Sequence, residues 1–181
     1  MPRVFLLMIS YINFVKFISK VCGVIATTLI ASAILVIIDM VVERYVFNLS
    51  TSWQTEFVIY SLAAATFVGC PYVLLVKGHV NVELLPHYFD YKGKLFLAML
   101  ASTMSLLFFI VLFILGSEMW WKSYTENWTT GTIWNAKMWK LYLSFPIGMF
   151  ITILQYFADI ISLLTKREMP FPGLEVNEEN N

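Results

Sequence analysis

The sequence predicts an all-α integral membrane protein with four transmembrane helices. Of its 181 residues, 59% are hydrophobic and 13% are charged, whereas an ordinary soluble domain has roughly 25% charged residues. The mean hydropathy of the chain is +0.74. Four apolar stretches are long enough to cross a hydrocarbon core, which takes about 20 helical residues. We therefore expect the chain to be embedded in a bilayer.

The first 20 residues are predicted to form an amphipathic helix that lies at the membrane interface. The apolar run Val4–Val15 is shorter than a span. Basic residues surround it at Arg3, Lys16 and Lys20. The alternative is a cleaved signal peptide, because Ala31-Ser32-Ala33 resembles a small-residue cleavage site. The apolar sequence continues to Ile38, further than a secretory signal needs, so we favour the interfacial helix.

The first two spans are predicted at residues 21–42 and 57–76, and both carry small residues at helical spacing. In the second, Ala65 and Gly69 are four residues apart. In the first, the small residues recur every four positions at Gly23, Thr27 and Ala31. Such faces allow two helices to approach closely in lipid. We expect them to pack against neighbouring helices.

The third and fourth spans are predicted at residues 95–116 and 141–164. Pro146 lies in the first turns of the fourth span, where a helix has no amide hydrogen bond to lose. Gly148 follows at the helical spacing of Ser144 and Thr152, which makes another small-residue face. The segment 117–140 between these spans carries five of the six tryptophans. It is typical of an aromatic belt at the membrane surface, and we expect it to be partly helical.

Carboxylates near the span ends are candidates for specific pairing. Trp53, Glu56 and Tyr60 share one helix face, which places the Glu56 carboxylate about one turn inside the membrane boundary. A carboxylate there needs a partner or a water-filled vestibule. Arg44 is the candidate partner, within the bundle or beside a second protein; the alternative is an ordinary interfacial pair. Asp39 and Asp159 also lie near boundaries, and the sequence assigns them no role.

The distribution of basic residues predicts the orientation. Eight of the 12 Lys and Arg residues fall in the N-terminal segment, the loop after the second span and the C-terminal flank. Because cytoplasmic loops are enriched in Lys and Arg, we expect both termini and the loop that contains His79 to be cytoplasmic. The tail 166–181 ends in EVNEENN and is predicted to be disordered.

Neither an enzyme nor a cofactor site is predicted. The two histidines, His79 and His87, fall in a loop, so haem ligands at membrane depth are missing. His79, Glu83 and His87 have i, i+4 spacing, but Pro86 interrupts the helix that would align them, and we predict no metal site. No Walker loop, GxSxG or HExxH occurs. Cys22 and Cys70 lie in apolar segments and indicate no disulfide.

The net charge is zero, so we expect lipid and protein partners and no nucleic acid.

Several short motifs follow one another in a characteristic order. They are Arg44-Tyr45-Val46-Phe47, Trp53-x-x-Glu56, Gly69, Lys77-Gly78-His79-Val80-Asn81-Val82-Glu83-Leu84-Leu85 and Phe145-Pro146-Ile147-Gly148. In combination they resemble the small (Q-type, DctQ-like) membrane subunit of tripartite ATP-independent periplasmic (TRAP) transporters, over about residues 20 to 165. The chain departs from the family pattern at Asn81, where a basic residue is common, and at Glu83, where aspartate is more usual.

The resemblance implies a component of an importer in the bacterial inner membrane. In such systems a large (M-type) subunit carries an organic acid with sodium, and a periplasmic substrate-binding protein delivers it. The small subunit is understood as a scaffold for the large one, without a transport site. Candidate interface or structural residues are Arg44, Trp53, Glu56, Gly69, Gly78, His79, Pro146 and Gly148. We expect His79 to cap the end of the second span beside Gly78.

Two other functions remain open from the sequence. One is a stand-alone small carrier, although no internal repeat is visible and charges inside the spans are confined to their ends. The other is a membrane anchor subunit of a redox enzyme, which would show haem in a visible spectrum.

Overall fold

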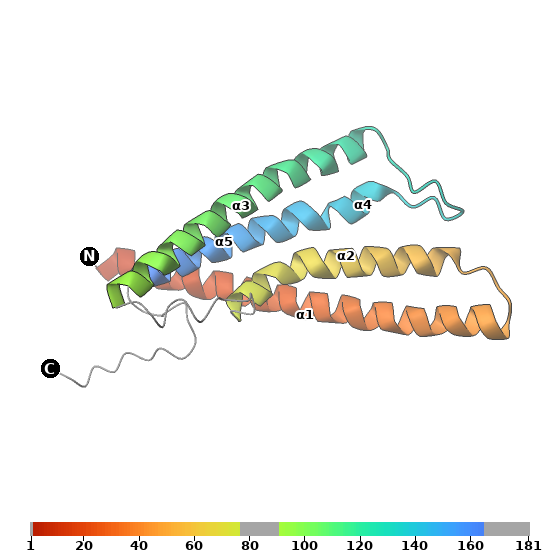
Figure 1. The fold of residues 1–181 in the computed structure, drawn as a ribbon, viewed down its shortest axis with the longest axis horizontal. Helices are drawn as coiled ribbons and strands as arrows, with labels where there is room; N and C mark the ends of the chain where they lie inside the picture. Colours follow the sequence, from red (N-terminus) through yellow and green to blue (C-terminus); the bar gives the residue numbers. More distant parts are fainter. Residues whose placement is uncertain (1, 77–90, 165–181) are drawn as a thin grey trace.

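The computed structural model describes residues 2–76 and 91–164 (Figure 1). Four of the described helical segments are long and apolar enough to cross a membrane, namely Met8–Val46, Ser52–Leu75, Met99–Thr125 and Met138–Ser162. This confirms the predicted fold class and the number of spans. Gly78, His79, the possible metal ligands Glu83 and His87, and the tail 166–181 lie outside the described residues.

Helix α1 extends from Pro2 to Val46, so the expected boundary near residue 20 is absent in the described chain. The N-terminal segment is thus continuous with the first span, and its placement at the membrane interface stays a prediction. No glycine or proline occurs between Arg3 and Cys22, and nothing in that segment interrupts the helix. A straight helix of 45 residues is about 67 Å long, longer than a whole bilayer of about 45 Å. Part of α1 must tilt or extend beyond the membrane.

The fourth span is broken into two helices. Helix α4 (Met138–Tyr142) and helix α5 (Ser144–Leu164) are separated at Leu143. The cause is Pro146, which lacks an amide hydrogen and whose ring clashes with the carbonyl four residues earlier, that of Tyr142. The sequence predicted a continuous helix from residue 141, because a proline so early in the span was expected to leave the helix unbroken.

Helices α2 and α3 both extend beyond their predicted ends. Helix α2 comprises Ser52–Leu75 and begins five residues earlier than expected. Helix α3 comprises Tyr91–Thr125 and includes the first third of the expected aromatic segment. Residues 126–137 of that segment are a loop in which Thr129 and Lys137 form an antiparallel bridge, and the last three residues of the segment begin helix α4. The expected surface helix is thus a continuation of α3.

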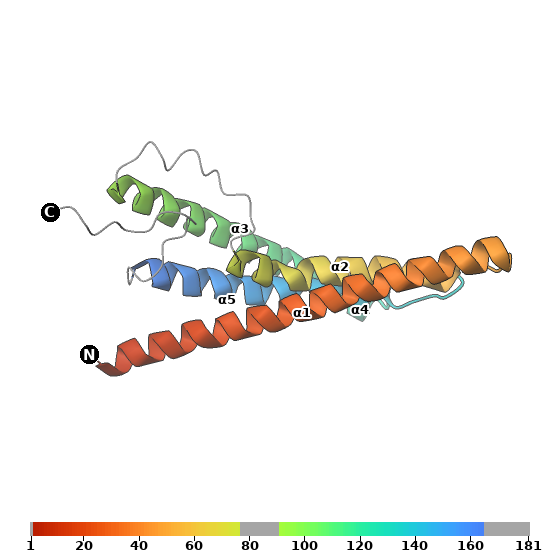
Figure 2. The ribbon, with the colours of Figure 1, turned by 90° about the horizontal axis from the view of Figure 1, so that it is seen from below.

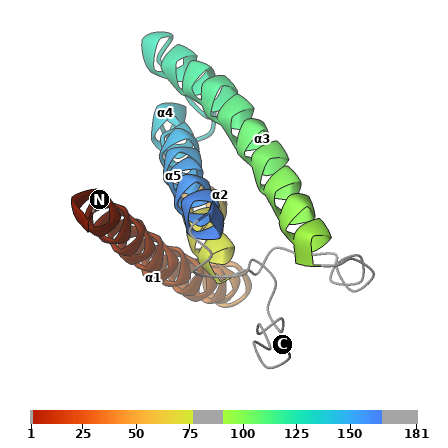
Figure 3. The same cartoon turned by 90° about the vertical axis from the view of Figure 1, so that its left-hand side faces the viewer.

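In the end-on view of Figure 3, α2 and α5 overlap between α1 on one side and α3 on the other. The contacts give the order α1, α2, α5, α3, with α1 also touching α5. Within the described chain, α3 contacts α5 and α4 but neither α1 nor α2. Helix α1 crosses α2 and α5 obliquely along the length of the molecule (Figure 2). We call the end with the α1–α2 connection and the loop 126–137 the loop end, and the opposite end, where α1 begins, the terminal end.

Buried apolar residues form two small clusters on opposite sides of α5. On one side, Ile12 and Val15 of α1 pack against Ala158. On the other, Leu106 of α3 packs with Ile153 and Tyr156. Helix α5 is therefore the element that both outer helices share. It contacts every other described helix.

Candidate partner interface and buried polar links

Two of the predicted small residues lie at close contacts between helices. A Cβ atom built on Gly148 would overlap the carbonyl group of Phe67, so the α5 backbone lies directly against that of α2. Beside this contact, the rings of Phe67 and Phe145 meet edge to face with centroids 4.4 Å apart. A Cβ on Gly69 would lie 3.1 Å from that of Ala26 on α1. Both glycines serve contacts within the chain.

The small-residue stripe predicted on α1 is only partly right. Gly23 is buried against the ring of Tyr72, but Thr27 and Ala31 are exposed. The face that α1 turns toward α2 is offset by about one position. Its buried small residues are Cys22, Ala26 and Ala33. Residues spaced exactly four apart move gradually around a helix that has 3.6 residues per turn, so they do not stay on one face. The sequence alone did not determine which face of α1 makes the contact.

Glu56 holds the loop 126–137 at the loop end of α2. Its side chain is only 6% exposed. The hydroxyl of Thr130 donates to the Glu56 carboxylate at 3.1 Å, and the hydroxyl of Thr132 donates to its other oxygen. The amide of Ala136 donates to the hydroxyl of Thr130 at 3.1 Å, which fixes the loop further. The carboxylate thus has the partners that its depth requires, and they are neutral.

Arg44 does not pair with Glu56 within the described chain. It is exposed at the end of α1, as is Trp53 at the start of α2. The predicted ion pair inside the bundle is therefore replaced by the two threonine hydroxyls. The α1–α2 link at this end is made by Gln54, which is fully buried and donates from Nε2 to the carboxylate of Glu43. A contact of Arg44 with another subunit stays a prediction.

A buried polar chain joins α1 to α5 near the terminal end. The hydroxyl of Ser19 donates to Oε1 of Gln155 at 2.9 Å. Nε2 of Gln155 in turn donates to the carboxylate of Asp159 at 3.0 Å. Ser19 and Gln155 are both 0% exposed. This chain fixes the rotation of α1 against α5 and gives Asp159 one partner.

Aromatic residues gather where α3 meets α4. The aromatic cluster consists of Trp120, Trp121, Tyr124 and Trp139. Trp120 and Tyr124 stack with centroids 6.0 Å apart, and Tyr124 meets Trp139 edge to face at 5.8 Å. An apolar α3–α5 groove of about 610 Å³ adjoins the cluster, lined by residues that include Phe113, Pro146 and Phe150.

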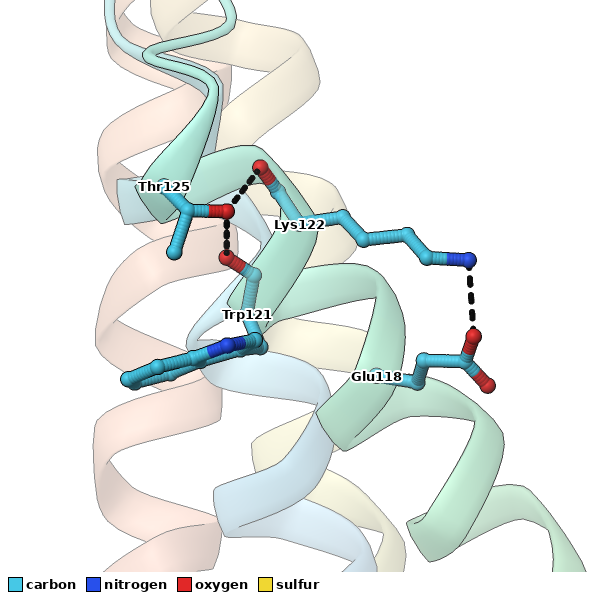
Figure 4. Close-up of polar contacts among 4 residues, drawn as sticks. All are labelled: Glu118, Trp121, Lys122 and Thr125. Atoms are coloured by element: carbon cyan, nitrogen blue, oxygen red, sulfur yellow. Dashed lines mark hydrogen bonds and ion pairs between the residues drawn. The ribbon is translucent and has the colours of Figure 1, made fainter.

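The face of α3 that points away from the other helices carries a charged pair near the loop end. Lys122 and Glu118 form an ion pair at 2.7 Å that projects away from the other helices (Figure 4). Their side chains are 54% and 57% exposed. The hydroxyl of Thr125 donates to the carbonyls of Trp121 and Lys122 and closes the last turn. None of these contacts reaches another helix.

Four buried polar atoms lack a hydrogen-bond partner within the described residues. They are Oε1 of Gln54, the hydroxyl of Tyr60, Nε1 of Trp120 and Oγ of Ser123. All four lie toward the loop end of α2 or α3. An unpaired buried polar group costs about 1–3 kcal/mol. An ordered internal water would remove this cost.

Much of the apolar surface is left uncovered by the chain itself. In the membrane-length window of α3 only 11% of the residues are buried, against 39% in the fourth span. Exposed apolar residues on α3 include Leu107, Phe108, Val111, Ile114 and Leu115, and on α1 they include Val24, Ile34, Leu35 and Ile38. These two faces lie at opposite ends of the helix row. Lipid or another membrane protein must cover them.

The sequence did not single out the residues that make the polar links. Ser19, Gln155, Gln54, Thr130 and Thr132 were not candidates. Of these residues, Gln155 could have been identified from the sequence, because an amide inside a long apolar span must find a hydrogen-bond partner. The threonines lie in a loop of common polar residues, and only the fold brings them to Glu56. No group of three or more His, Cys, Asp or Glu side chains in the described part of the chain could hold a metal.

Comparisons with known proteins identify the family. A search of curated proteins finds no match. The family model described as "Tripartite ATP-independent periplasmic transporters, DctQ component" matches residues 33–166. The match covers most of the chain, including helix α2, the aromatic cluster and helix α5. The protein therefore belongs to the DctQ family, the small membrane components of TRAP transporters, and is a transporter component and not an enzyme.

Proposed function

We propose that this chain is the fixed scaffold on which the large transport subunit of a TRAP transporter is mounted. The transport would be sodium-coupled uptake of an organic acid, delivered by a periplasmic substrate-binding protein. The chain would be located in the bacterial inner membrane, with both termini in the cytoplasm. This follows the family and the distribution of basic residues.

The observation that carries the proposal is the open row of helices. A closed four-helix bundle would bury one face of every helix, but here α3 contacts only α5 and α4 among the described helices. Helices α1 and α3 therefore lie on opposite sides of α5, each with an uncovered apolar face. An open row of this kind suits the support of a larger membrane protein.

The buried polar side chains favour a scaffold over a carrier. Ser19 and Gln155 bond to each other, and Glu56 bonds to the loop. The hydroxyl of Thr152 bonds to the carbonyl of Gly148 in its own helix. These bonds occupy the buried polar groups within the chain and leave few ligands for a solute.

The first test is a pull-down of the tagged chain from its native membrane in mild detergent. We expect a large polytopic protein at about one copy per chain, identified by mass spectrometry. The purified chain should show no solute flux after reconstitution alone. Recovery of the chain without a partner, together with flux, would contradict the proposal and favour a stand-alone carrier.

A tryptophan scan identifies the face that meets the partner. Lipid adapts to a larger side chain, whereas a packed protein contact does not. We therefore expect substitutions by tryptophan to reduce partner recovery on one exposed face and not on the other. The test positions are Ile34 and Ile38 on α1, and Val111 and Ile114 on α3. Full recovery at all four positions would exclude both faces and contradict the role we assign to the helix row.

A further inference from the structure

A second groove lies between α1 and α2 near the terminal end. Its volume is about 480 Å³. Its walls include Lys20, Thr27 and Thr28 from α1 and Tyr72 and Val76 from α2. The groove exists because Gly23 has no side chain: the ring of Tyr72 occupies the place of its Cβ, and the space on either side stays open.

The depth of this groove in the membrane follows from the charges on both helices. On α1, Lys20 is the last charged residue before the uncharged run 21–38. On α2, the uncharged run 57–76 ends at Val76, and Lys77 follows in the sequence. The two runs therefore reach the same membrane boundary at Lys20 and Val76. Both residues line the groove, so it opens at the level of the lipid headgroups.

From this mouth the groove extends into the hydrocarbon layer. The distance along α1 from Lys20 to Thr28 is about 12 Å at the rise of an α-helix. The hydroxyls of Thr27 and Thr28 donate to the carbonyls of Gly23 and Val24, each at 2.9 Å. Since both donors are used within the helix, the threonines offer mainly methyl groups to an occupant. The inner part of the groove is thus suited to an acyl chain.

Lys20 provides the charge at the mouth. Its side chain is exposed, and the structure records no ion pair for it among the described residues. A basic groove between transmembrane helices at headgroup level is a recognised binding site for anionic lipid headgroups. A lysine without an ion pair among the described residues and an apolar channel behind it match the two parts of a phospholipid. A helix of another protein would match the channel, but it would need a carboxylate at this level to pair with the lysine.

We propose that the α1–α2 groove binds one anionic phospholipid, with its phosphate at Lys20 and an acyl chain along Thr27 and Thr28. The lipid covers the contact of Gly23 with Tyr72, where the two helices are joined by a single ring over a glycine. It would therefore stabilise the terminal end of the α1–α2 pair. This site is independent of the scaffold role and of which side of the membrane the terminal end faces.

The test uses the full chain, purified with its partner, delipidated and then incubated in detergent with phosphatidylglycerol or phosphatidylcholine. Native mass spectrometry counts the lipids that stay bound. We expect wild type to retain phosphatidylglycerol in preference to phosphatidylcholine. Lys20→Gln should reduce retention of phosphatidylglycerol about fivefold. The matched control is Lys122→Gln, an exposed lysine at the loop end, which should retain the wild-type amount.

A second variant separates the groove from the charge. Thr28→Trp fills the channel and keeps Lys20, and it should also lose the bound phosphatidylglycerol while the thermal unfolding of the protein shows that it is folded. Equal retention by wild type and both variants would overturn the proposal. So would a Thr28→Cys variant that cross-links to the partner subunit in native membranes, because a protein helix would then occupy the groove.

Discussion

Helix α2 and helix α3 are held to the rest of the molecule in different ways. Helix α2 lies backbone against backbone with α5 at Gly148, and its Gly69 lies close to the Cβ of Ala26 on α1. Helix α3 meets α5 through rings: Phe109 lies 5.4 Å from Tyr156, and Phe113 lies 5.9 Å from Phe150. At Gly148 the obstacle to a methyl group is backbone. At the α3–α5 contact a Cβ on Gly116 would overlap the ring of Phe145, which is a side chain, and an open groove lies beside it.

The difference teaches where this chain is rigid and where it can adapt. In lipid there is no hydrophobic force between helices, so packing and hydrogen bonds decide which helices stay together. Close backbone contact gives many short-range contacts and tolerates no change of volume. Ring contacts leave side chains free to repack. We infer that α1, α2 and α5 form the rigid part, and that α3 adjusts to a partner.

The largest expected effect comes from Gly148→Leu, which breaks the rigid part. The obstacle is the carbonyl group of Phe67, and a backbone cannot rotate out of the way as a side chain can. We expect the free energy of unfolding to fall by about 3 kcal/mol, at the upper end for overpacking. Thermal unfolding and size-exclusion chromatography in mild detergent measure it. The control is Ala31→Leu on the exposed face of α1, which should be as stable as wild type. An equal loss of unfolding free energy in both variants would show that the close contact at Gly148 is no more sensitive to added volume than an exposed face.

The sequence predicted the helices better than it predicted their contacts. Length and hydropathy suffice for the spans, because a bilayer demands about 20 apolar residues. The motif glycines Gly69 and Gly148 were correctly expected at close contacts. The partner of Glu56 was not predictable, since Thr130 and Thr132 are 74 and 76 residues away and reach it only when the loop folds back over α2. The break at Leu143 was missed because the steric demand of a proline acts on the preceding turn.

The next largest effect tests the polar link that joins α1 to the rigid part. Gln155→Leu removes the hydrogen bonds of Gln155 with Ser19 and Asp159 in a buried place. We expect a loss of about 1–2 kcal/mol. A double-mutant cycle of Ser19→Ala with Gln155→Leu, measured by chemical denaturation, should give a coupling of about 0.6 to 1.7 kcal/mol. Thr66→Ala, an exposed hydroxyl that bonds within its own helix, is the control. Strictly additive effects would mean that the link does not hold the helices.

A smaller and more local effect is expected at the attachment of the loop to α2. Glu56→Ala removes the acceptor of Thr130 and Thr132, so the loop 126–137 should open more often. Amide hydrogen exchange in that loop should be roughly tenfold faster, while exchange in α1 and α2 is unchanged. Glu118→Ala removes an exposed carboxylate and serves as the control. Faster exchange throughout α2 would show instead that Glu56 supports the rigid part.

The smallest effect on stability is expected on the outer face of α3. Lys122→Gln removes the ion pair with Glu118, whose two side chains are more than half exposed. An exposed pair one helical turn apart contributes about 0.5 kcal/mol or less, so thermal unfolding should be nearly unchanged. A loss above about 1 kcal/mol would mean that α3 depends on this face more than on its ring contacts with α5. If α3 is the adaptable helix, the fold does not need its outer face, and that face is free to serve a partner. Because Lys122→Gln leaves the stability unchanged, a lower recovery of the large subunit with this variant than with wild type reports on the partner contact alone.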